Sequence, residues 1–456
     1  MNPPRNAFGA SPPRGRHQRP GKAGSAAAPR WLAALALLIA TCAHAQLSDT
    51  EQRIAAAVKQ RMPQALELLE KSVRVNSGTL NAEGVREVGR IFRAELDGIG
   101  FTTRWAEMPP EMKRGGHLIA SRDGGQGKRV LLMGHMDTVF EKDSAVALWE
   151  RRGDRVRGQG VNDMKGGDVI LIEALRALQS VGALDKARVD VILTGDEERT
   201  GSPREIGRAD LIELAKRADY ALSFEGSSRE RGIDMASISR RSSGGWTLTV
   251  KGRPGHSAGV FSQNAGYGAI YEGARILNAF REQLIEPSLT FNPGVILGGT
   301  NIGYSDETAT GTSFGKSNVI ARELRIIGDL RYLTPEQGDR IKRRMREIVG
   351  ASLPGATSTI AFRDGYPPMP PTDAGRRLID VYSKTSDDAG LGPIGTLDPS
   401  MRGAGDVQFA APYTIGIDGL GAAGRGSHTD DEDLEIASIE RGAIRAALFI
   451  YRLTRP

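Results

Sequence analysis

Residues 130–140 read VLLMGHMDTVF, and residues 189–198 read VDVILTGDEE. Each stretch is a short apolar run that ends in polar side chains: His135 and Asp137 in the first, and the adjacent Glu197 and Glu198 in the second. Apolar runs of this length are typical of strands that are buried on both faces of a parallel sheet. We therefore expect two core strands whose carboxyl ends carry ionisable residues.

The residues around these stretches alternate between helical and strand-like patterns. Residues 169–181 have the apolar spacing of a helix, and residues 220–224 form a third strand-like run. The remaining predictions are helices at 51–73 (kinked at Pro63), 81–98, 376–387 and 438–451, and a strand at 413–417. Strands that alternate with helices predict an α/β sheet with functional groups on the loops that follow its strands.

A block from 241 to 362 interrupts this pattern. It predicts a strand at 246–250, a helix at 265–280, strands at 289–297 and 319–332, a helix at 335–349 and a strand at 358–362. The order βαββαβ is that of a ferredoxin-like domain. We therefore expect a catalytic domain in two parts, 46–240 and 363–456, with a smaller domain inserted at 241–362.

Three further ionisable residues lie after strand-like runs or among glycines. Asp163 lies in GQGVNDMKGG (158–167), Glu225 follows the run at 220–224, and His428 lies in GRGSHTDD (424–431). Taken singly, each residue has an ordinary explanation as a turn, rim or loop residue, and so do the polar ends of the two strands. Their shared position, where open α/β sheets bind ligands, favours a common metal site instead.

The chemistry of these side chains suits such a site. His135 can bind a metal, while Asp137, two residues later on the same face, can hold the other ring nitrogen. Glycines around Asp163 let the backbone approach closely, so its carboxylate could bridge two cations. Two neighbouring glutamates repel each other when buried. A dication would offset that cost, with one glutamate as ligand and the other free to accept a proton.

The first 45 residues have the pattern of an export signal. A basic, Pro/Gly-rich segment precedes the apolar run 31–40, and Ala43-His44-Ala45 supplies a cleavage site. The run is too short for a stable membrane span. The single cysteine, Cys42, lies inside this signal; it could be lipidated, but Thr41 before it fits poorly. We expect a periplasmic or secreted protein, without membrane attachment after cleavage, whose metal ligands are His, Asp and Glu.

Two features that could suggest nucleotide or nucleic-acid binding do not support it. The net charge of +6 comes from six basic residues in the first 45, and removing them leaves 55 basic against 55 acidic residues. The basic pI therefore indicates no nucleic-acid partner. The motif GLGAAG (419–424) matches G-x-G-x-x-G, but it leads directly into Ser427 and His428 rather than into an apolar helix.

The combined motifs resemble a known enzyme family. GHMDTVF (134–140), GDEE (195–198), FEG (224–226) and GSH (426–428) are similar to the zinc-dependent family of glutamate carboxypeptidases, aminoacylases and desuccinylases, closest to the bacterial carboxypeptidase G type. The similarity covers nearly the whole mature chain. It implies a two-zinc exopeptidase-type catalytic domain with a central mixed sheet, interrupted by a ferredoxin-like lid and dimerisation domain.

The resemblance also implies roles for single residues. His135 and Glu225 would hold one Zn²⁺, Glu198 and His428 the other, and Asp163 would bridge the two ions of each subunit. Glu197 would be the general base and Asp137 the partner of His135. The Asp163–Met164 peptide bond would be cis.

Further roles fall on the inserted domain. His256, in GRPGHSAG (252–259), is similar to a lid histidine that reaches the active site of the partner subunit and stabilises the oxyanion. Asn318 and Arg331 resemble lid residues that hold the free carboxylate of the substrate. Arg402, before GAGD (403–406), is a weaker candidate and could equally be structural.

These implications predict a homodimeric metallocarboxypeptidase that releases a C-terminal amino acid, such as glutamate, from small peptides, N-acyl amino acids or folate-like conjugates. An aminoacylase-type amidohydrolase shares the same chemistry and remains open, since the two differ mainly in pocket shape. An inactive zinc-binding scaffold is a third interpretation, which the presence of Glu197 disfavours.

Overall fold

The computed structural model describes residues 47–306 and 308–455, so the predicted signal sequence lies outside the described residues. None of the described helices is long and apolar enough to cross a bilayer. The elements before the insertion are α1 (Asp49–Gln60), α2 (Met62–Val73), α3 (Ala82–Asp97), β1 (Thr102–Ala106), η1 (Pro110–Met112), β2 (His117–Asp123), β3 (Arg129–His135), β4 (Glu150–Arg152), β5 (Arg155–Arg157), η2 (Val161–Lys165), α4 (Gly166–Ser180), β6 (Arg188–Thr194), α5 (Arg204–Gly207), α6 (Ala209–Arg217), β7 (Tyr220–Ser223), β8 (Ser228–Glu230) and β9 (Ile233–Ala236).

The inserted block and the last part of the chain follow. The inserted elements are β10 (Ser243–Gly252), η3 (Ser257–Gly259), α7 (Gly268–Gln283), β11 (Thr290–Gly299), β12 (Asn301–Ser305), β13 (Thr310–Phe314), β14 (Glu323–Arg331), α8 (Pro335–Gly350) and β15 (Ala356–Tyr366). The last elements are α9 (Asp373–Asp388), β16 (Ile394–Thr396), η4 (Pro399–Met401), α10 (Val407–Ala410), β17 (Ile415–Asp418), β18 (Gly424–Arg425), β19 (Asp433–Glu435) and α11 (Ile436–Thr454).

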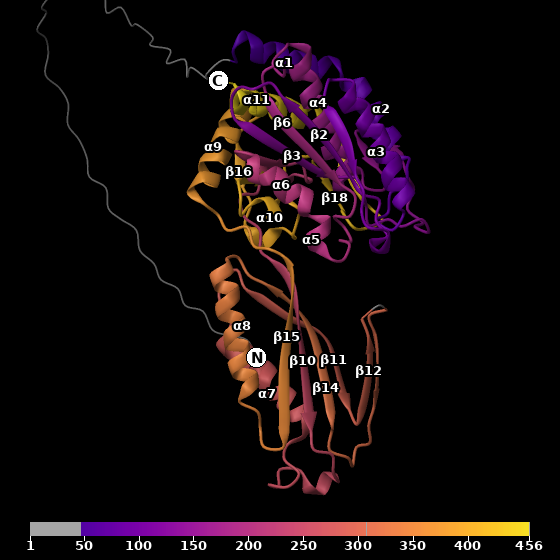
Figure 1. Cartoon of the computed structure of the whole chain (residues 1–456), viewed down its shortest axis with the longest axis vertical. Coiled ribbons are helices and arrows are strands. Elements are labelled where there is room, and N and C mark those ends of the chain that lie inside the picture. Colours follow the sequence, from indigo (N-terminus) through magenta and orange to yellow (C-terminus); the bar gives the residue numbers. More distant parts are fainter. Residues whose placement is uncertain (1–46, 307, 456) are drawn as a thin grey trace, which may run out of the picture. The chain divides into compact units, whose positions relative to one another are not determined.

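A six-stranded mixed sheet forms the centre of the α/β part (Figure 1), and its strand order is β1-β2-β6-β3-β7-β17. Strands β6, β3, β7 and β17 run parallel to one another, whereas β2 pairs antiparallel with both of its neighbours, β1 and β6. Alternate residues of β3 face opposite layers: Val130 and Leu132 pack in the core with α4 and α11, and Leu131 and Met133 pack in the core with α6. This burial on both faces explains the continuous apolar run that the sequence shows.

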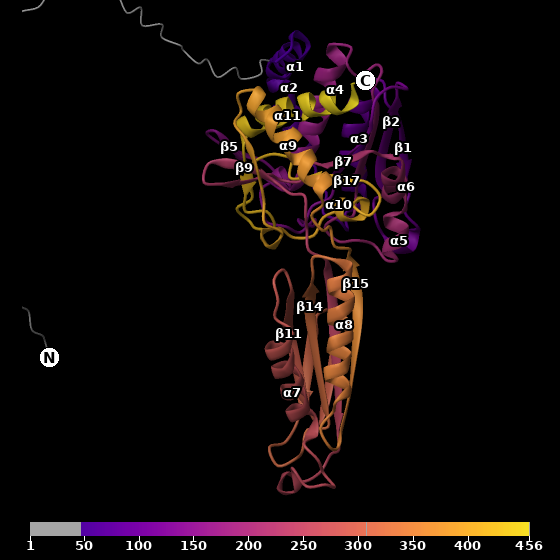
Figure 2. The same cartoon turned by 90° about the vertical axis from the view of Figure 1, so that its left-hand side faces the viewer.

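The inserted domain has its own antiparallel sheet, in the order β11-β14-β10-β15 (Figure 2). Trp246 of β10 and Ile326 of β14 pack in one core with Phe280 of α7 and Met345 of α8. The strand order and the two helices confirm the predicted ferredoxin-like arrangement.

Several details differ from the sequence-based prediction, which also lacked β1, β2 and α6. The helix expected at 51–73 is two helices that break at Arg61, because Pro63 lies in the first turn of α2, where its missing N–H costs nothing. The strand expected from residue 319 begins at Glu323. The hairpin β12–β13 was not predicted; β13 is exposed throughout and β12 is only half-buried, so neither strand has a buried face that would give a periodic apolar signal.

Candidate metal centre

The structure brings the five predicted metal ligands to one edge of the central sheet. They come from five separate segments: His135 ends β3, Asp163 lies in η2, Glu198 follows β6, Glu225 follows β7, and His428 follows β18. Their ligand atoms form two groups, and the atoms within each group lie within 4.8 Å of one another. One group is His135, Asp163 and Glu225, and the other is Asp163, Glu198 and His428.

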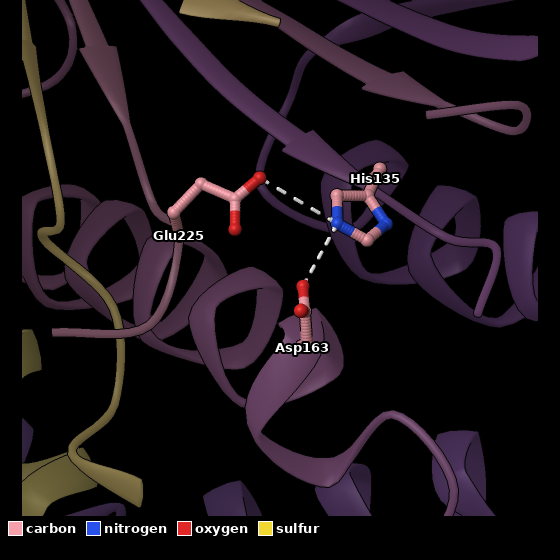
Figure 3. A group of neighbouring side chains, drawn as sticks. All are labelled: His135, Asp163 and Glu225. Carbon is pink, nitrogen blue, oxygen red and sulfur yellow. Dashed lines mark hydrogen bonds and ion pairs between the residues drawn. The ribbon is translucent and has the colours of Figure 1, made fainter. Parts of the chain in front are cut away.

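Asp163 is shared by both groups. Its Oδ1 lies 3.2 Å from Nε2 of His135, and its Oδ2 lies 3.2 Å from Nε2 of His428. Figure 3 shows the first group, in which Glu225 Oε1 is 3.6 Å from the same nitrogen of His135. In the second group, Glu198 Oε2 is 3.0 Å from Nε2 of His428. A carboxylate that turns one oxygen to each group has the geometry of a bridging ligand.

The turn that carries Asp163 depends on glycine. Gly160 has φ of +69°, and a Cβ there would lie 2.2 Å from Cγ2 of Thr138. A Cβ on Gly167 would lie 1.9 Å from the carbonyl oxygen of Phe224, so glycine lets α4 begin directly against the end of β7. The Asp163–Met164 peptide is cis, as the resemblance implies. The predicted close approach of this glycine-rich loop is therefore confirmed.

Asp137 organises the residues around it. It is fully buried, and its carboxylate accepts hydrogen bonds from the backbone N–H of Glu197 (3.0 Å) and of Glu198 (3.1 Å) and from the Thr79 hydroxyl (2.6 Å). The backbone carbonyl of Asp137 lies 3.0 Å from Nδ1 of His135 and accepts its hydrogen bond, and Oδ1 lies 3.5 Å from the same nitrogen, while Nε2 of His135 faces the candidate metal group. Asp137 thus holds both the imidazole and the two glutamates in place.

Glu197 lines a cavity of about 370 Å³ together with the candidate ligands Asp163, Glu198, Glu225 and His428. Burial and the nearby Glu225 raise its pKa well above the usual range. Its carbonyl oxygen accepts a hydrogen bond of 3.0 Å from the hydroxyl of Tyr366, the last residue of β15. The side chain is therefore close to the ligands without belonging to either ligand group.

The charges of the cavity fit a pair of divalent cations. Burial raises the pKa of Glu225 to about 7 and also raises that of Glu198. Burial would raise the pKa of Asp163 as well, but hydrogen bonds from His135 and His428 lower it. Buried carboxylates this close are unfavourable without compensation, and a bound dication supplies it by favouring their ionised form. The donor set of imidazole nitrogens and carboxylate oxygens is one that Zn²⁺ accepts.

His428 has an unusual backbone. Its φ is +66°, in the left-handed region, which costs a residue with a Cβ roughly 1–2 kcal/mol. Such conformations cluster at functional sites. The backbone that presents the imidazole to Asp163 and Glu198 is therefore one that only a functional or packing constraint would maintain.

One residue that supports the site was not predicted. Glu432 is buried, and its Oε1 accepts hydrogen bonds from the backbone N–H of Asn162 (2.8 Å) and of Asp163 (3.0 Å). Burial raises its pKa to about 8. In the sequence it is one of four consecutive acidic residues, 430–433, a pattern that usually indicates a solvated loop.

The predicted residues of the inserted domain do not line this cavity. His256 and Asn318 are exposed and adjacent: His256 pairs with Val319, and Ser257 N–H donates to the carbonyl of Asn318 at 2.9 Å. Arg331 lies at the opposite end of β14 and pairs with Asp329 at 2.9 Å. Within one chain the three residues are therefore not brought to the metal centre.

Comparison with known proteins identifies the family. Residues 131–452, well over half of the chain, match the model of Peptidase family M20/M25/M40. The chain belongs to this family. Membership in M20/M25/M40 confirms the resemblance inferred from the motifs, and it makes the chain a hydrolase of the metallopeptidase and amidohydrolase type.

The relatives that are found include two kinds of enzyme. Carboxypeptidase G2 of Pseudomonas sp. (strain RS-16) is 29% identical over 431 residues, which cover 92% of this chain and 97% of that protein. Succinyl-diaminopimelate desuccinylase of Gluconobacter oxydans (strain 621H) is 26% identical, over 76% of this chain and 86% of that protein. The two enzymes have different substrates, so family membership leaves the substrate open.

Solved structures support the M20 fold. Aminopeptidase PepT from Bacillus cereus ATCC 10987 superimposes with a TM-score of 0.68 at 16% identity, covering 86% of this chain and 98% of that one. YXEP of Bacillus subtilis, described as a dinuclear metal binding peptidase from the M20 family, has a TM-score of 0.58 at 13% identity, covering 87% and 99%. At these identities the likeness shows the fold alone.

Proposed function

We propose that this chain is an exported zinc carboxypeptidase that hydrolyses an amide bond and releases a C-terminal amino acid, such as glutamate, from a small peptide or an N-acyl or folate-like conjugate. The observation that carries the proposal is the position of Asp163. Its two oxygens each face a histidine at 3.2 Å, so that two donor groups share one carboxylate. We assign one Zn²⁺ to His135 and Glu225 and a second to Glu198 and His428, with Asp163 as the bridge.

The chain's own residues supply the rest of the chemistry. Zinc ions held by these residues would lower the pKa of the attacking water from ~15.7 toward ~7 and would polarise the scissile carbonyl. Glu197 accepts the proton of the attacking water and then delivers it to the leaving nitrogen. Asp137 keeps the imidazole of His135 oriented, and Glu432 keeps the backbone of Asp163 in place.

A second candidate is an N-acyl-amino-acid amidohydrolase of the aminoacylase or desuccinylase type. The desuccinylase relatives favour it, since several are 25–30% identical to this chain. An inactive scaffold is the weakest candidate, because the general base Glu197 lines the same cavity as four of the five candidate ligands. The fifth ligand, His135, is buried and does not line the cavity.

The substrate is tested directly with purified, zinc-loaded mature protein. Amino-acid release is measured from a panel of N-acyl amino acids, dipeptides and a pteroyl-glutamate conjugate. Selective release of C-terminal glutamate is the expected result. Release mainly from simple N-acyl substrates would replace the carboxypeptidase by the amidohydrolase, and no release from any of them would exclude both.

We also propose a homodimer in which His256 and Asn318 of one copy complete the site of the other. Eight residue steps along β14 separate Glu323, near this pair, from Arg331, a span of roughly 26 Å at ~3.3 Å per residue. One small substrate therefore cannot contact His256 and Arg331 of the same chain. Sedimentation of the mature protein is expected to give a dimer, and a fully active monomer would refute the proposal.

Mixed dimers give a sharper test. Glu197→Ala and His256→Ala chains are each expected to be nearly inactive alone. When they are co-expressed, about half of the dimers are mixed and one of the two sites in each is intact, so about a quarter of the wild-type activity returns. If His256 served its own chain, the mixture would remain inactive.

The export signal is tested by expression of the full chain in a bacterial host. The processed protein is expected in the periplasm, with Gln46 at its N-terminus. A cytoplasmic, unprocessed chain would contradict the assignment of residues 1–45.

A further inference from the structure

Arg240, which is buried, and Arg402, whose side chain is 14% exposed, line the cavity of the candidate metal centre without a part in the reaction described above. Arg240 follows β9 and is 2% exposed, and Arg402 follows η4. The backbone of Arg240 is fixed by two hydrogen bonds of 2.9 Å with Met369, one in each direction. Both arginines thus come from the α/β part of the chain and share the cavity with Glu225 and Glu197.

The charge of these arginines is only partly compensated within the described residues. Among the described residues, the only carboxylate within 4 Å of either guanidinium is that of Asp418, which pairs with Arg240 Nη2 and lies 3.8 Å from Arg402 Nη2. Within 4 Å the two cations therefore share one buried anion, while the candidate ligand Glu225 and the general base Glu197 lie farther away in the same cavity. An uncompensated buried charge is unfavourable, and it is stabilised when an anion enters the cavity.

The free donors belong to Arg402. Its Nη1 donates to the carbonyl of Gly226 at 2.6 Å and to the Ser228 hydroxyl at 3.5 Å. Its Nε and Nη2 have no hydrogen-bond acceptor among the residues that the structure describes. These two nitrogens form the side edge of the guanidinium, which matches the two oxygens of a carboxylate.

Arg240 provides charge and support rather than a free edge. Its Nη1 donates to the carbonyl of Gly403 at 2.8 Å, next to Arg402, while its Nε is buried without a partner. Burial and the adjacent Arg240 guanidinium lower the pKa of Arg402, as expected for two cations that are not fully neutralised. The pair is therefore prepared for an anionic ligand.

We propose that Arg402, supported by Arg240, is the subsite that binds a carboxylate of the substrate's leaving amino acid. This assignment rests on the proposed function and deepens it. The hydrogen bond of Arg402 to Gly226 places the subsite one residue from the candidate ligand Glu225. Arg331, in contrast, is already paired with Asp329 and does not line the cavity. The carboxylate is either the α-carboxylate of any C-terminal residue or the side-chain carboxylate of glutamate.

The test compares matched substrates in the zinc-loaded enzyme. The substrates are N-benzoyl-L-glutamate, its α-carboxamide and its γ-carboxamide. Arg402→Gln is chosen because replacement of Arg240 would leave Asp418 buried without its partner. Arg425→Gln is the control, since Arg425 lines the same cavity but its side chain is 75% exposed and pairs with Asp433.

Arg402→Gln is expected to lower kcat/KM for the glutamate substrate about 30-fold, and less than about 3-fold for the amide that lacks the recognised carboxylate. Whichever amide the wild type discriminates against identifies the carboxylate. Arg402→Lys is expected to lose an intermediate amount, because it keeps the charge but not the bidentate edge. An equal loss of kcat/KM for all three substrates in Arg402→Gln would overturn the proposal. It would also be overturned if Arg331→Gln no longer discriminated between the glutamate substrate and its amides while Arg402→Gln still did.

A binding measurement separates this proposal from the proposed function. Glutarate, which has no scissile bond, is titrated calorimetrically into zinc-loaded wild type, Arg402→Gln and Arg425→Gln, each with its metal content measured. The wild type and the control are expected to bind it alike, and Arg402→Gln about 30-fold more weakly. Equal binding by all three would overturn the subsite. A wild type that binds glutarate through Arg402 but hydrolyses none of the substrates would retain the subsite and refute the carboxypeptidase.

Discussion

Replacing Asp137 by asparagine tests how the site is held together. The two oxygens of Asp137 accept three hydrogen bonds, from the backbone of Glu197 and of Glu198 and from Thr79. An asparagine has only one acceptor oxygen. In the better orientation the NH2 group of the asparagine takes the place of Oδ2, and its oxygen takes the place of Oδ1. The Thr79 hydroxyl can then turn to accept a hydrogen bond from the NH2 group, but the backbone N–H of Glu198 faces that NH2 group and loses its acceptor. The variant also lacks the negative charge beside His135.

The magnitude follows from the bonds lost. A hydrogen bond to a charged, buried group is worth about 1.5–3 kcal/mol, so Asp137→Asn should destabilise the fold by about 2 kcal/mol. At roughly 2–4 °C per kcal/mol for a domain of 150–250 residues, Tm should fall by roughly 4–8 °C. Loss of an outer partner of a metal-binding histidine typically weakens metal affinity 10–100-fold; because the backbone carbonyl of Asp137 still accepts from Nδ1 of His135 in the variant, a zinc Kd about 10 times higher is expected.

Thermal unfolding and competition with a zinc chelator measure the two effects, and Asp190→Asn is the matched control. Asp190 is equally buried and accepts hydrogen bonds from Ser121, Arg129 and Arg217, but it lies on β6 at the end far from Glu197. The control should lose comparable stability and bind zinc normally. If Asp137→Asn also bound zinc with the wild-type affinity, the role assigned to Asp137 would be wrong.

Three further predictions concern the metal, the connection to the inserted domain and the effect of acid. Chelation of zinc should abolish turnover and lower Tm, and added zinc should restore both; activity that survives exhaustive dialysis against a chelator would contradict the metal assignment. Tyr366→Phe removes the donor to the carbonyl of Glu197 and should lower kcat about tenfold with zinc content unchanged, since a net hydrogen bond is worth about 0.5–1.5 kcal/mol; an unchanged kcat would show that this contact does not position Glu197. Burial alone would raise the pKa of Asp196, but the effect of Arg208 is larger, so the pKa lies below its usual value. The pair therefore stabilises the fold above about pH 4, and this stabilisation is lost as the pH falls through the lowered pKa. Urea unfolding at pH 3, 4 and 7 should therefore show that the free energy of unfolding falls steeply with decreasing pH in the wild type and less steeply in Arg208→Met. The same pH dependence in both proteins would count against the ion pair.

Much of the fold was predictable because buried positions of helices and strands appear in the sequence as apolar residues at regular spacing. The strands that end near His135, Glu197 and Glu225 are buried on both faces, so each appears as an apolar run followed by polar residues. The inserted domain was predictable for a similar reason, since its helices and strands bury one face each. The hairpin β12–β13 buries little and therefore left no pattern.

The candidate site was predictable only in part. Its ligands occur at strand ends and in glycine-rich loops, where position limits their possible roles. Glu432 and Arg240 carry no such mark, because an acidic run and a single arginine usually belong to the solvated surface. Their importance depends on pairings across the chain, Glu432 with the backbone of Asp163 and Arg240 with Asp418, that no local pattern contains.

The central claim, that two metal ions and Glu197 together hydrolyse an amide bond, is tested most directly by measuring bound metal and turnover on the same samples of wild type and Glu197→Gln. The account predicts two zinc ions per chain in both proteins and a kcat about a thousandfold lower in the variant, in line with removal of a general base. Wild-type turnover by Glu197→Gln with both ions bound would contradict the account.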